Sequence, residues 1–180
     1  MKRLLTFVSF GFVILVFALR TFVVGLSVIP QNGMYPNFPA GSRVLTLKHP
    51  YRAAGQVRRG DVVAYLQDIG GVQYKFIWRV VGLPGERVET KNGQLIVDGS
   101  QAGYRPLATG ENSSMFAEST KGISYSVAFL PARMPIADVS YRVPPNSFFV
   151  LGDNRHNAAD IRVYGLVPFS AIVGKAVFSW

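Results

Sequence analysis

The chain has 180 residues, no cysteine and two histidines, and its formal net charge at pH 7 is +9. This length allows one domain plus a short anchor. Without cysteine, neither a disulfide framework nor a thiolate metal site can form, and two histidines argue against a histidine-based metal site. We therefore predict a protein with no metal ion and no cofactor.

The amino terminus has a basic start followed by an uncharged apolar run from Leu4 to Leu19. The run is short for a membrane span of about 20 residues, but apolar character continues past Arg20. A cleaved secretory signal is one interpretation, because Gly25-Leu26-Ser27 resembles a cleavage site, and a buried core helix is another. We favour an uncleaved anchor because the run is too uniformly apolar for a core helix and the only cleavage-like site is weak.

This interpretation divides the chain into an anchor at residues 1–29 and a second domain at residues 30–180. Because the start is basic, we expect the amino terminus to stay in the cytoplasm. The prediction is a single-pass membrane protein whose carboxyl-terminal domain lies on the extracytoplasmic side, with the lipid bilayer as one partner.

Positive charge is concentrated early in the second domain, where no acidic residue occurs between residues 37 and 60. The basic residues there include Arg43, Lys48, Arg52, Arg58 and Arg59. Such a cluster suggests nucleic acid, anionic lipid or simply a solvated basic face. Basic and aromatic residues do not interleave as in single-strand-binding proteins, and the tether places the domain outside the cytoplasm. We predict no nucleic acid partner and favour anionic lipid over nucleic acid, with a solvated basic face as the open alternative.

From Ile29 onward, short β-prone runs alternate with Gly, Pro and Asn-Gly, a pattern typical of antiparallel sheets. The predicted strands are residues 44–47, 61–66, 74–81, 87–90, 94–97 and 148–151. Asn92-Gly93 predicts a tight turn between two of them. Residues 104–142 show less pattern, with a loop expected at residues 110–114, and no helix is expected after the anchor. The predicted fold class is mainly β, with packed or barrel-like antiparallel sheets.

A polar loop follows the strand at residues 148–151, within the stretch VPPNSFFVLGDNRHNAADIRVYGLVPFSAIVGK at residues 143–175. Gly152 ends the apolar run, and Asn and Asp side chains after it can bond their own backbone. Asp153 with Arg155, and Asp160 with Arg162, place opposite charges at close spacing. The sequence therefore predicts a rigid loop.

This stretch resembles the last signature block of the type I signal peptidases, the serine–lysine membrane proteases that remove signal peptides. The same resemblance appears in IPQNGMYP at residues 29–36, RGDVV at residues 59–63 and FIWRVVGLPGE at residues 76–86. It covers about residues 20–100 and 140–180. The resemblance implies a bacterial cytoplasmic membrane protein with a coiled β domain whose apolar surface rests on the membrane. It also implies structural roles for Arg79, Asp153, Asn154, Arg155, Asp160 and Arg162.

In this family a serine attacks the peptide carbonyl and a lysine takes the serine's proton. The resemblance places Gly33 at the serine position and Trp78 at the lysine position. Glycine has no side chain to attack with, and indole offers one N–H donor and no usable base. Ala158 stands where the family has a serine that orients the lysine, and Gln31 stands where it has an oxyanion serine. The resemblance therefore implies a degenerate site without catalytic residues.

Three nearby residues are candidate substitutes for the lost pair. Lys75 lies three residues before Trp78, so strand alternation points it to the opposite face. Ser27 lies six residues before Gly33, and Asn32 is adjacent to Gly33 but is a very weak nucleophile. None is a convincing replacement. We expect Gly33 and Trp78 to face each other, with Ala158 close to the indole and Arg79 pointing away. The retained peptide groove is assigned to Gln31, Asn32, Met34 and Pro36.

The predicted function is that of a membrane-anchored signal-peptidase-like protein that is catalytically inactive. It would bind a secreted or pilin-like polypeptide, or an active paralogous peptidase, as a chaperone or scaffold. The alternative is an active serine-type signal peptidase that cleaves preproteins with displaced residues, such as His156 with another serine. A third interpretation is a purely structural β domain that has lost the groove as well.

Overall fold

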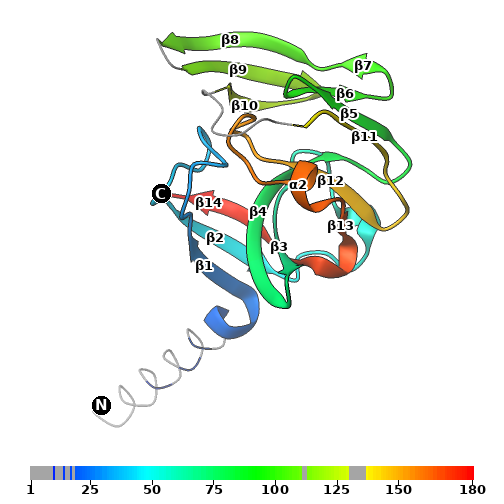
Figure 1. The fold of residues 1–180 in the computed structure, drawn as a ribbon. Helices are drawn as coiled ribbons and strands as arrows, with labels where there is room; N and C mark the ends of the chain where they lie inside the picture. The colour runs from blue at the N-terminus through cyan, green and yellow to red at the C-terminus, as the bar shows by residue number, and fades with distance from the viewer. Residues whose placement is uncertain (1–9, 11–13, 15–16, 18, 111–112, 130–136) are drawn as a thin grey trace.

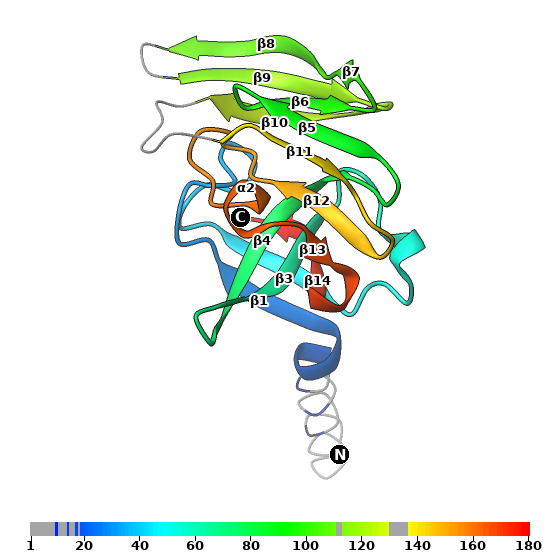
Figure 2. The ribbon, with the colours of Figure 1, turned by 45° about the vertical axis from the view of Figure 1, so that its right-hand side comes forward.

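The computed structural model describes residues 10, 14, 17, 19–110, 113–129 and 137–180. Strands dominate this part of the chain and form three sheets, in which every strand pair is antiparallel (Figure 1; Figure 2). The predicted fold class, mainly β with antiparallel sheets, is confirmed.

The largest sheet has seven strands in the order β1-β2-β14-β3-β4-β12-β13. Their bounds are Val24–Val28 (β1), Arg43–Lys48 (β2), Ile172–Ser179 (β14), Val62–Ile69 (β3), Val72–Gly82 (β4), Ser147–Leu151 (β12) and Val167–Pro168 (β13). Strand β14 lies between β2 and β3, so an early and a late segment of the chain are hydrogen-bonded in one sheet. Val, Ile, Leu and Phe fill most of these strands, as expected for a half-buried pleated surface.

Two smaller sheets lie together on the side of the molecule away from β1 (Figure 1; Figure 2). One has the order β10-β9-β8 and the other β11-β5-β6-β7. Their bounds are Gly103–Gly110 (β8), Ser113–Thr120 (β9), Ile123–Phe129 (β10), Val139–Arg142 (β11), Arg87–Lys91 (β5), Gln94–Val97 (β6) and Ser100–Gln101 (β7).

The hairpin between β5 and β6 confirms the predicted turn. Lys91 pairs with Gln94, and Asn92 and Gly93 both have positive φ, 51° and 76°. A two-residue turn with both central residues in this region matches the twist of the flanking strands, and Asn-Gly is the pair that adopts it most readily.

Strands β8, β9 and β10 occupy residues where the sequence showed little pattern. Their sequences are rich in Gly, Ser and Thr, and their one acidic residue, Glu118, is fully buried in a polar network. The expected loop at residues 110–114 is the hairpin between β8 and β9, of which residues 111 and 112 lie outside the described part.

From residue 19 onward, the described part of the chain also contains four short helical segments. They are the π-helical turn η1 (Leu19–Val23), the 3-10 turns η2 (Ala54–Gln56) and η3 (Phe169–Ala171), and the one-turn helix α2 (Ile161–Tyr164). Helix α2 was not expected, because a single turn carries no helical periodicity. The carboxylate of Asp160 caps it by accepting from the Arg162 backbone N–H, and Gly165 ends it.

No helix among the described residues is long and apolar enough to cross a bilayer. The anchor predicted at residues 4–19 lies mostly outside the described part. The sheet includes residues that the sequence analysis assigned to the anchor: Val24–Val28 pairs along its whole length with β2. Side-chain burial alternates along this segment as it does in a strand: Gly25 and Ser27 are half-buried, while Leu26 and Val28 are exposed.

Candidate functional site

Gly33 and Trp78 lie in direct contact, as the sequence predicted. Trp78 belongs to β4, where it pairs with Val63 of β3, and Gly33 lies in the turn that follows β1. A Cβ atom built on Gly33 would lie 2.6 Å from Cζ3 of Trp78 and closer still to Cη2. The indole also stacks on Phe76, with ring centroids 6.2 Å apart. The indole thus occupies the space that a side chain at position 33 would need.

Gly152 and Ala158 complete the contact. A Cβ on Gly152 would lie 2.5 Å from the Gly33 carbonyl oxygen, 3.1 Å from Cζ3 of Trp78, and closer still to Cβ of Ala158. Glycine is required at position 152 because three segments approach it this closely. From the sequence, Gly152 is expected only to end a strand, and nothing in the sequence indicates its role in packing. We name these four residues, Gly33, Trp78, Gly152 and Ala158, the apolar cluster.

The apolar cluster holds no hydroxyl, amine or carboxylate. The indole N–H of Trp78 is buried without a hydrogen-bond partner among the described residues. Burial, and secondly the charge of Asp160, raise the pKa of the nearby Tyr65. Tyr65 therefore stays protonated at neutral pH and is no general base. Within the described part of the chain, no group of three or more His, Asp or Glu side chains could hold a metal ion.

The residues assigned to the groove differ in accessibility. Gln31 and Asn32 are exposed and Pro36 is half-buried, whereas Met34 is only 1% exposed. Asn32 is fixed on both sides, because its side-chain oxygen accepts from the Ala40 N–H (2.9 Å) and its carbonyl accepts from the Asn154 amide (3.1 Å). Gln31 and Asn32 are thus the members of this set that a peptide could reach, while Met34 anchors the turn in the core.

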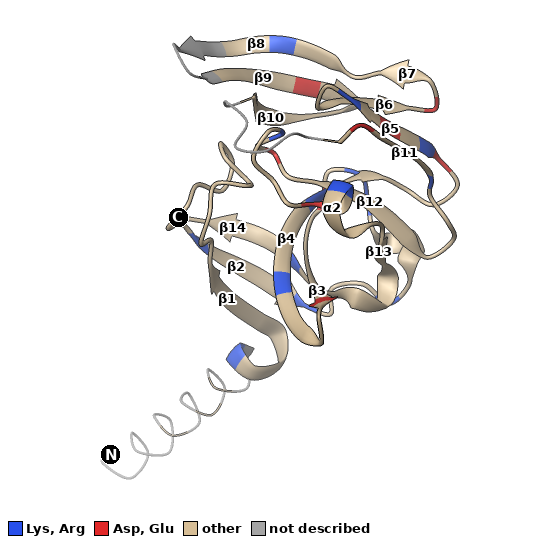
Figure 3. Ribbon diagram, in the orientation of Figure 1, with Lys and Arg blue, Asp and Glu red and all other residues tan. Residues whose placement is uncertain are grey.

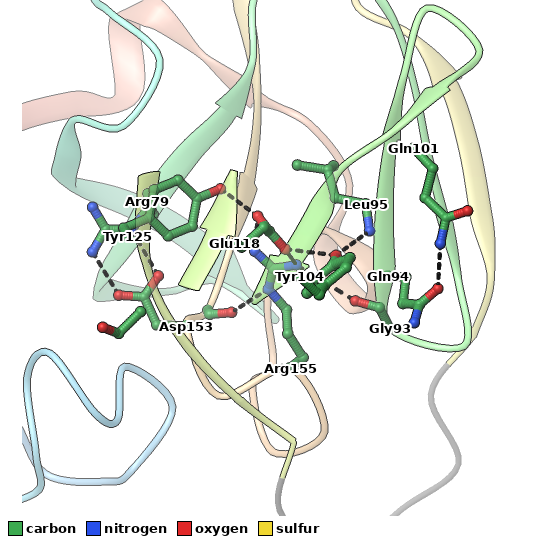
Figure 4. Close-up of polar contacts among 12 residues, drawn as sticks. Arg79, Gly93, Gln94, Leu95, Gln101, Tyr104, Glu118, Tyr125, Asp153 and Arg155 are labelled. Carbon is green, nitrogen blue, oxygen red and sulfur yellow. Dashed lines mark hydrogen bonds and ion pairs between the residues drawn. The ribbon is translucent and has the colours of Figure 1, made fainter. Parts of the chain in front are cut away.

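Arg79, the next residue on β4, points away from the apolar cluster, as strand alternation requires. Its guanidinium donates two hydrogen bonds to Asp153, Nε to Oδ1 at 2.7 Å and Nη2 to Oδ2 at 2.6 Å, and a third to the Gly60 carbonyl (Figure 4). It also lies over the ring of Tyr125, 4.4 Å from its centroid. Burial alone would lower the pKa of Arg79, but the charge of Asp153 outweighs it and the pKa is raised.

Arg155 is completely buried and pairs with Glu118 of β9 (Figure 4). Its Nη2 donates to Oε1 of Glu118 at 2.7 Å, and its Nη1 donates to Oε2. The Glu118 carboxylate also accepts hydrogen bonds from two tyrosine hydroxyls, those of Tyr104 at 2.7 Å and Tyr125 at 2.6 Å. Burial alone would raise the pKa of Glu118, but the charge and hydrogen bonds of Arg155 and the two hydroxyls lower it.

The ion pairs of the polar loop differ in part from the expectation. Asp160 and Arg162 do pair, with Nη2–Oδ2 at 2.7 Å, and Asp160 also accepts from the Gly152 N–H at 3.0 Å. Asp153 and Arg155 each pair elsewhere. Asn154 bridges to Ala128 of β10, which directs Arg155 towards β9, and the Asp153 carboxylate is already occupied by Arg79. The sequence did not indicate Glu118 as the partner of Arg155, because Glu118 lies in the weakly patterned region at residues 104–142.

A sequence model of the family described as signal peptidase, peptidase S26, matches residues 2–180. The chain belongs to this signal peptidase family. It is 32% identical over 171 residues to Signal peptidase I of Leptolyngbya laminosa, covering 92% of this chain and 72% of the relative. It is 30% identical over 171 residues to Signal peptidase I S of Bacillus subtilis (strain 168), covering 92% and 82%. A crystal structure of a signal peptidase I from Enterococcus faecalis V583 is 22% identical with a TM-score of 0.40, covering 68% of this chain and 97% of that one.

This signal peptidase family member also brings together two residues that the sequence analysis considered separately. Nζ of Lys75 lies 3.0 Å from Oγ of Ser27, joining β4 to β1. Phe76 and Trp78 stack on each other, so Lys75 lies on the opposite face of β4, as alternation predicted. Burial, and secondly the positive charge of Lys48, lower the pKa of Lys75. Sequence spacing could not reveal this contact between residues 48 positions apart.

His156, the other base considered from the sequence, packs edge-on against Phe129 with ring centroids 5.2 Å apart. Its ring also lies against Gly93, at the turn between β5 and β6. The imidazole therefore faces the small sheets and helps to seat the polar loop on them.

Proposed function

We propose that this signal peptidase family member is membrane-anchored and catalytically inactive, and that it binds a polypeptide without cutting it. The observation that carries the proposal is the contact between Gly33 and Trp78. The family's chemistry needs a hydroxyl and an amine at these positions, and here an indole fills the space of the missing side chain. Loss of nucleophile or base from a serine protease costs a factor on the order of 10⁶ in rate.

The proposed ligand is an extended chain, either a secreted or pilin-like polypeptide or an active paralogous peptidase, with this protein as chaperone or scaffold. Two unpaired strand edges support strand addition as the mode of binding. Strand β1 ends the seven-stranded sheet, and β12 pairs with β4 only at Arg79, Val80 and Gly82. Among the residues that the structure describes, no strand therefore pairs with residues 72–78 of β4 on that side. Backbone groups on such edges are free to pair with a peptide.

Cleavage of a preprotein by the purified full chain in detergent tests inactivity. The wild type should show no cleavage above the buffer background, and the double revertant Gly33→Ser/Trp78→Lys is assayed beside it as the matched comparison. Release of mature protein by the wild type at more than about a thousandth of the rate of an active signal peptidase would overturn this part of the proposal.

Peptide binding is tested separately, because a dead site can still hold a ligand. Signal-peptide fragments added up to millimolar concentration should change the fluorescence of Trp78 and Trp180, and Trp180→Phe isolates the response of Trp78. A flat titration with every fragment would favour a purely structural β domain.

The proposed location is the bacterial cytoplasmic membrane, with a single span and the β domain on the extracytoplasmic side. The basic start and apolar run support it, as do the exposed Phe22 and Val23 beside Arg20 in η1. Protease added to intact spheroplasts should digest the β domain, and protection of the domain would show the reverse orientation.

The contact between Ser27 and Lys75 favours one second candidate, a peptidase with displaced residues. Their 3.0 Å separation and the lowered pKa of Lys75 fit a nucleophile and its base. Against this, the Lys75 side chain is exposed, and water stabilises its charged form. If the wild type cleaves a preprotein, Ser27→Ala should abolish that activity; cleavage that survives Ser27→Ala excludes this pair.

A further inference from the structure

Strands β1 and β4 present their unpaired edges to the same region. The evidence is the hydrogen bond between Lys75 of β4 and Ser27 of β1, two strands that are not neighbours in the sheet. A long lysine side chain can reach across a gap of about 9–10 Å, the distance between strands that have one further strand between them. A peptide added to either edge therefore passes beside Lys75.

A second ammonium group lies beside the first. The Lys48 side chain passes over Gly25 of β1, with Cε 3.5 Å from the position of a Cβ there, and its Nζ donates to the carbonyl oxygens of Arg20 and Thr21. Gly25 and Ser27 are two residues apart on a strand, so both lysines lie over one face of β1. Their charges are close enough for Lys48 to lower the pKa of Lys75.

No described carboxylate neutralises these two charges. Neither lysine forms an ion pair with any residue that the structure describes. Strands β2 and β4 carry basic residues, and none of β1, β2 and β4 carries an acidic one (Figure 3). By strand register the nearest acid is Asp68, at the tip of the hairpin between β3 and β4, where it accepts from the Gly71 N–H at 3.0 Å. Two adjacent cations with only neutral partners form an attractive site for an anion.

We propose that Lys75 and Lys48 select an extended peptide that carries a carboxylate side chain at the position passing Ser27. The inference rests on the proposed function, since it names the kind of peptide that the strand edges accept. Because side chains of an added strand alternate between faces, only every second peptide position points towards the lysines. The acidic residue is therefore recognised only when it occupies one of these alternate positions of the peptide.

The test uses the purified full chain in uncharged detergent at pH 7 and low salt. The probe is a fluorescein-labelled ten-residue peptide of Ala, Ser and Val in which a single Asp is moved along the sequence, with Asn at the same position as the uncharged isostere. Fluorescence anisotropy gives the ratio of the two affinities. We expect Asp to bind about threefold more tightly than Asn, at alternate positions only.

The variant Lys75→Gln should bring this ratio to about one, and Lys91→Gln, which removes an equally exposed charge on β5, should leave it at the wild-type value. Equal affinity for Asp and Asn peptides in the wild type would overturn the inference and leave the proposed function standing. Failure of every peptide to bind would overturn the proposed function itself.

A lipid phosphate is the competing anion, and vesicles of phosphatidylglycerol distinguish it. If Lys75→Gln, but not Lys91→Gln, lost binding to these vesicles while the Asp to Asn ratio was one throughout, the lysines would serve the membrane. That outcome would overturn the proposal.

Discussion

Trp78 and Arg79 are neighbours on β4, and they point into regions built in opposite ways. Trp78 lies in the apolar cluster, where its indole N–H has no described partner and a glycine faces its ring. Arg79 enters a buried polar network in which Asp153, Arg155 and Glu118 each form several charged hydrogen bonds (Figure 4). One region is held together by apolar packing, and the other by paired charges and hydrogen bonds.

The difference follows from the cost of removing a single group. A buried ion pair that loses one partner leaves an uncompensated charge, which costs about 3–5 kcal/mol. The contact between Gly33 and Trp78 involves no buried charge, so a change there leaves none uncompensated. The polar network can therefore be explained by stability, and its presence is no evidence of catalysis.

The largest expected effect is on the polar network. Glu118→Gln should lower the free energy of unfolding by about 3–5 kcal/mol, because it leaves the buried guanidinium of Arg155 without a counter-charge. Urea denaturation at pH 7 measures the change. The matched control is Arg87→Ala, which removes an exposed ion pair with Glu89 and should cost less than about 1 kcal/mol. Equal effects for the two variants would contradict this account of the network.

The pH dependence of stability should trace to the same carboxylate. The folded-state pKa of Glu118 lies below its ordinary value of 4.5, so its contribution is complete above about pH 4.5 and is lost as the pH falls through the lowered folded value. Urea midpoints between pH 7 and pH 3 should therefore fall less steeply for Glu118→Gln than for the wild type. Parallel pH profiles would show that other groups dominate acid unfolding.

A smaller loss is expected in the apolar cluster. Trp78→Lys should lower the free energy of unfolding by about 1–3 kcal/mol, because the ammonium would enter an apolar site where neither Gly33 nor Ala158 offers a hydroxyl. Trp78→Phe is the control, since it removes the unpartnered indole N–H and keeps an apolar ring. Thermal melts should rank the wild type first, Trp78→Phe next and Trp78→Lys last; an unchanged melting temperature for Trp78→Lys would refute the proposed packing.

The smallest effect is the coupling between the two positions. Gly33→Ser alone should cost about 1–3 kcal/mol, because its Cβ would overlap the indole. In Gly33→Ser/Trp78→Lys the overlap is absent, and the serine hydroxyl can accept a hydrogen bond from the lysine amine. The free energies of unfolding lost by the two single variants should therefore sum to at least about 0.5 kcal/mol more than the loss in the double variant. Urea denaturation of the four proteins in this cycle measures the coupling, and strict additivity would mean that the side chains do not interact.

Several strands could be predicted from local sequence. Short β-prone runs located β2, β3, β4 and β12 of the largest sheet, and the Asn92-Gly93 turn located β5 and β6 of a smaller one, because β propensity and turn chemistry are properties of a few adjacent residues. Family resemblance located Gly33, Trp78 and Ala158, which the structure brings together around Gly152. What these positions do for function is still a proposal, tested by the cleavage assay.

Tertiary structure alone decided which distant residues meet. Arg155 finds Glu118, 37 positions away, instead of the nearby Asp153, because the polar loop runs beside β10 and Arg79 already holds Asp153. Lys75 reaches Ser27 only because β1 and β4 approach each other across the sheet. Alternation sets the face on which a side chain lies, whereas its partner depends on how the sheets pack, and no local pattern in the chain encodes that packing.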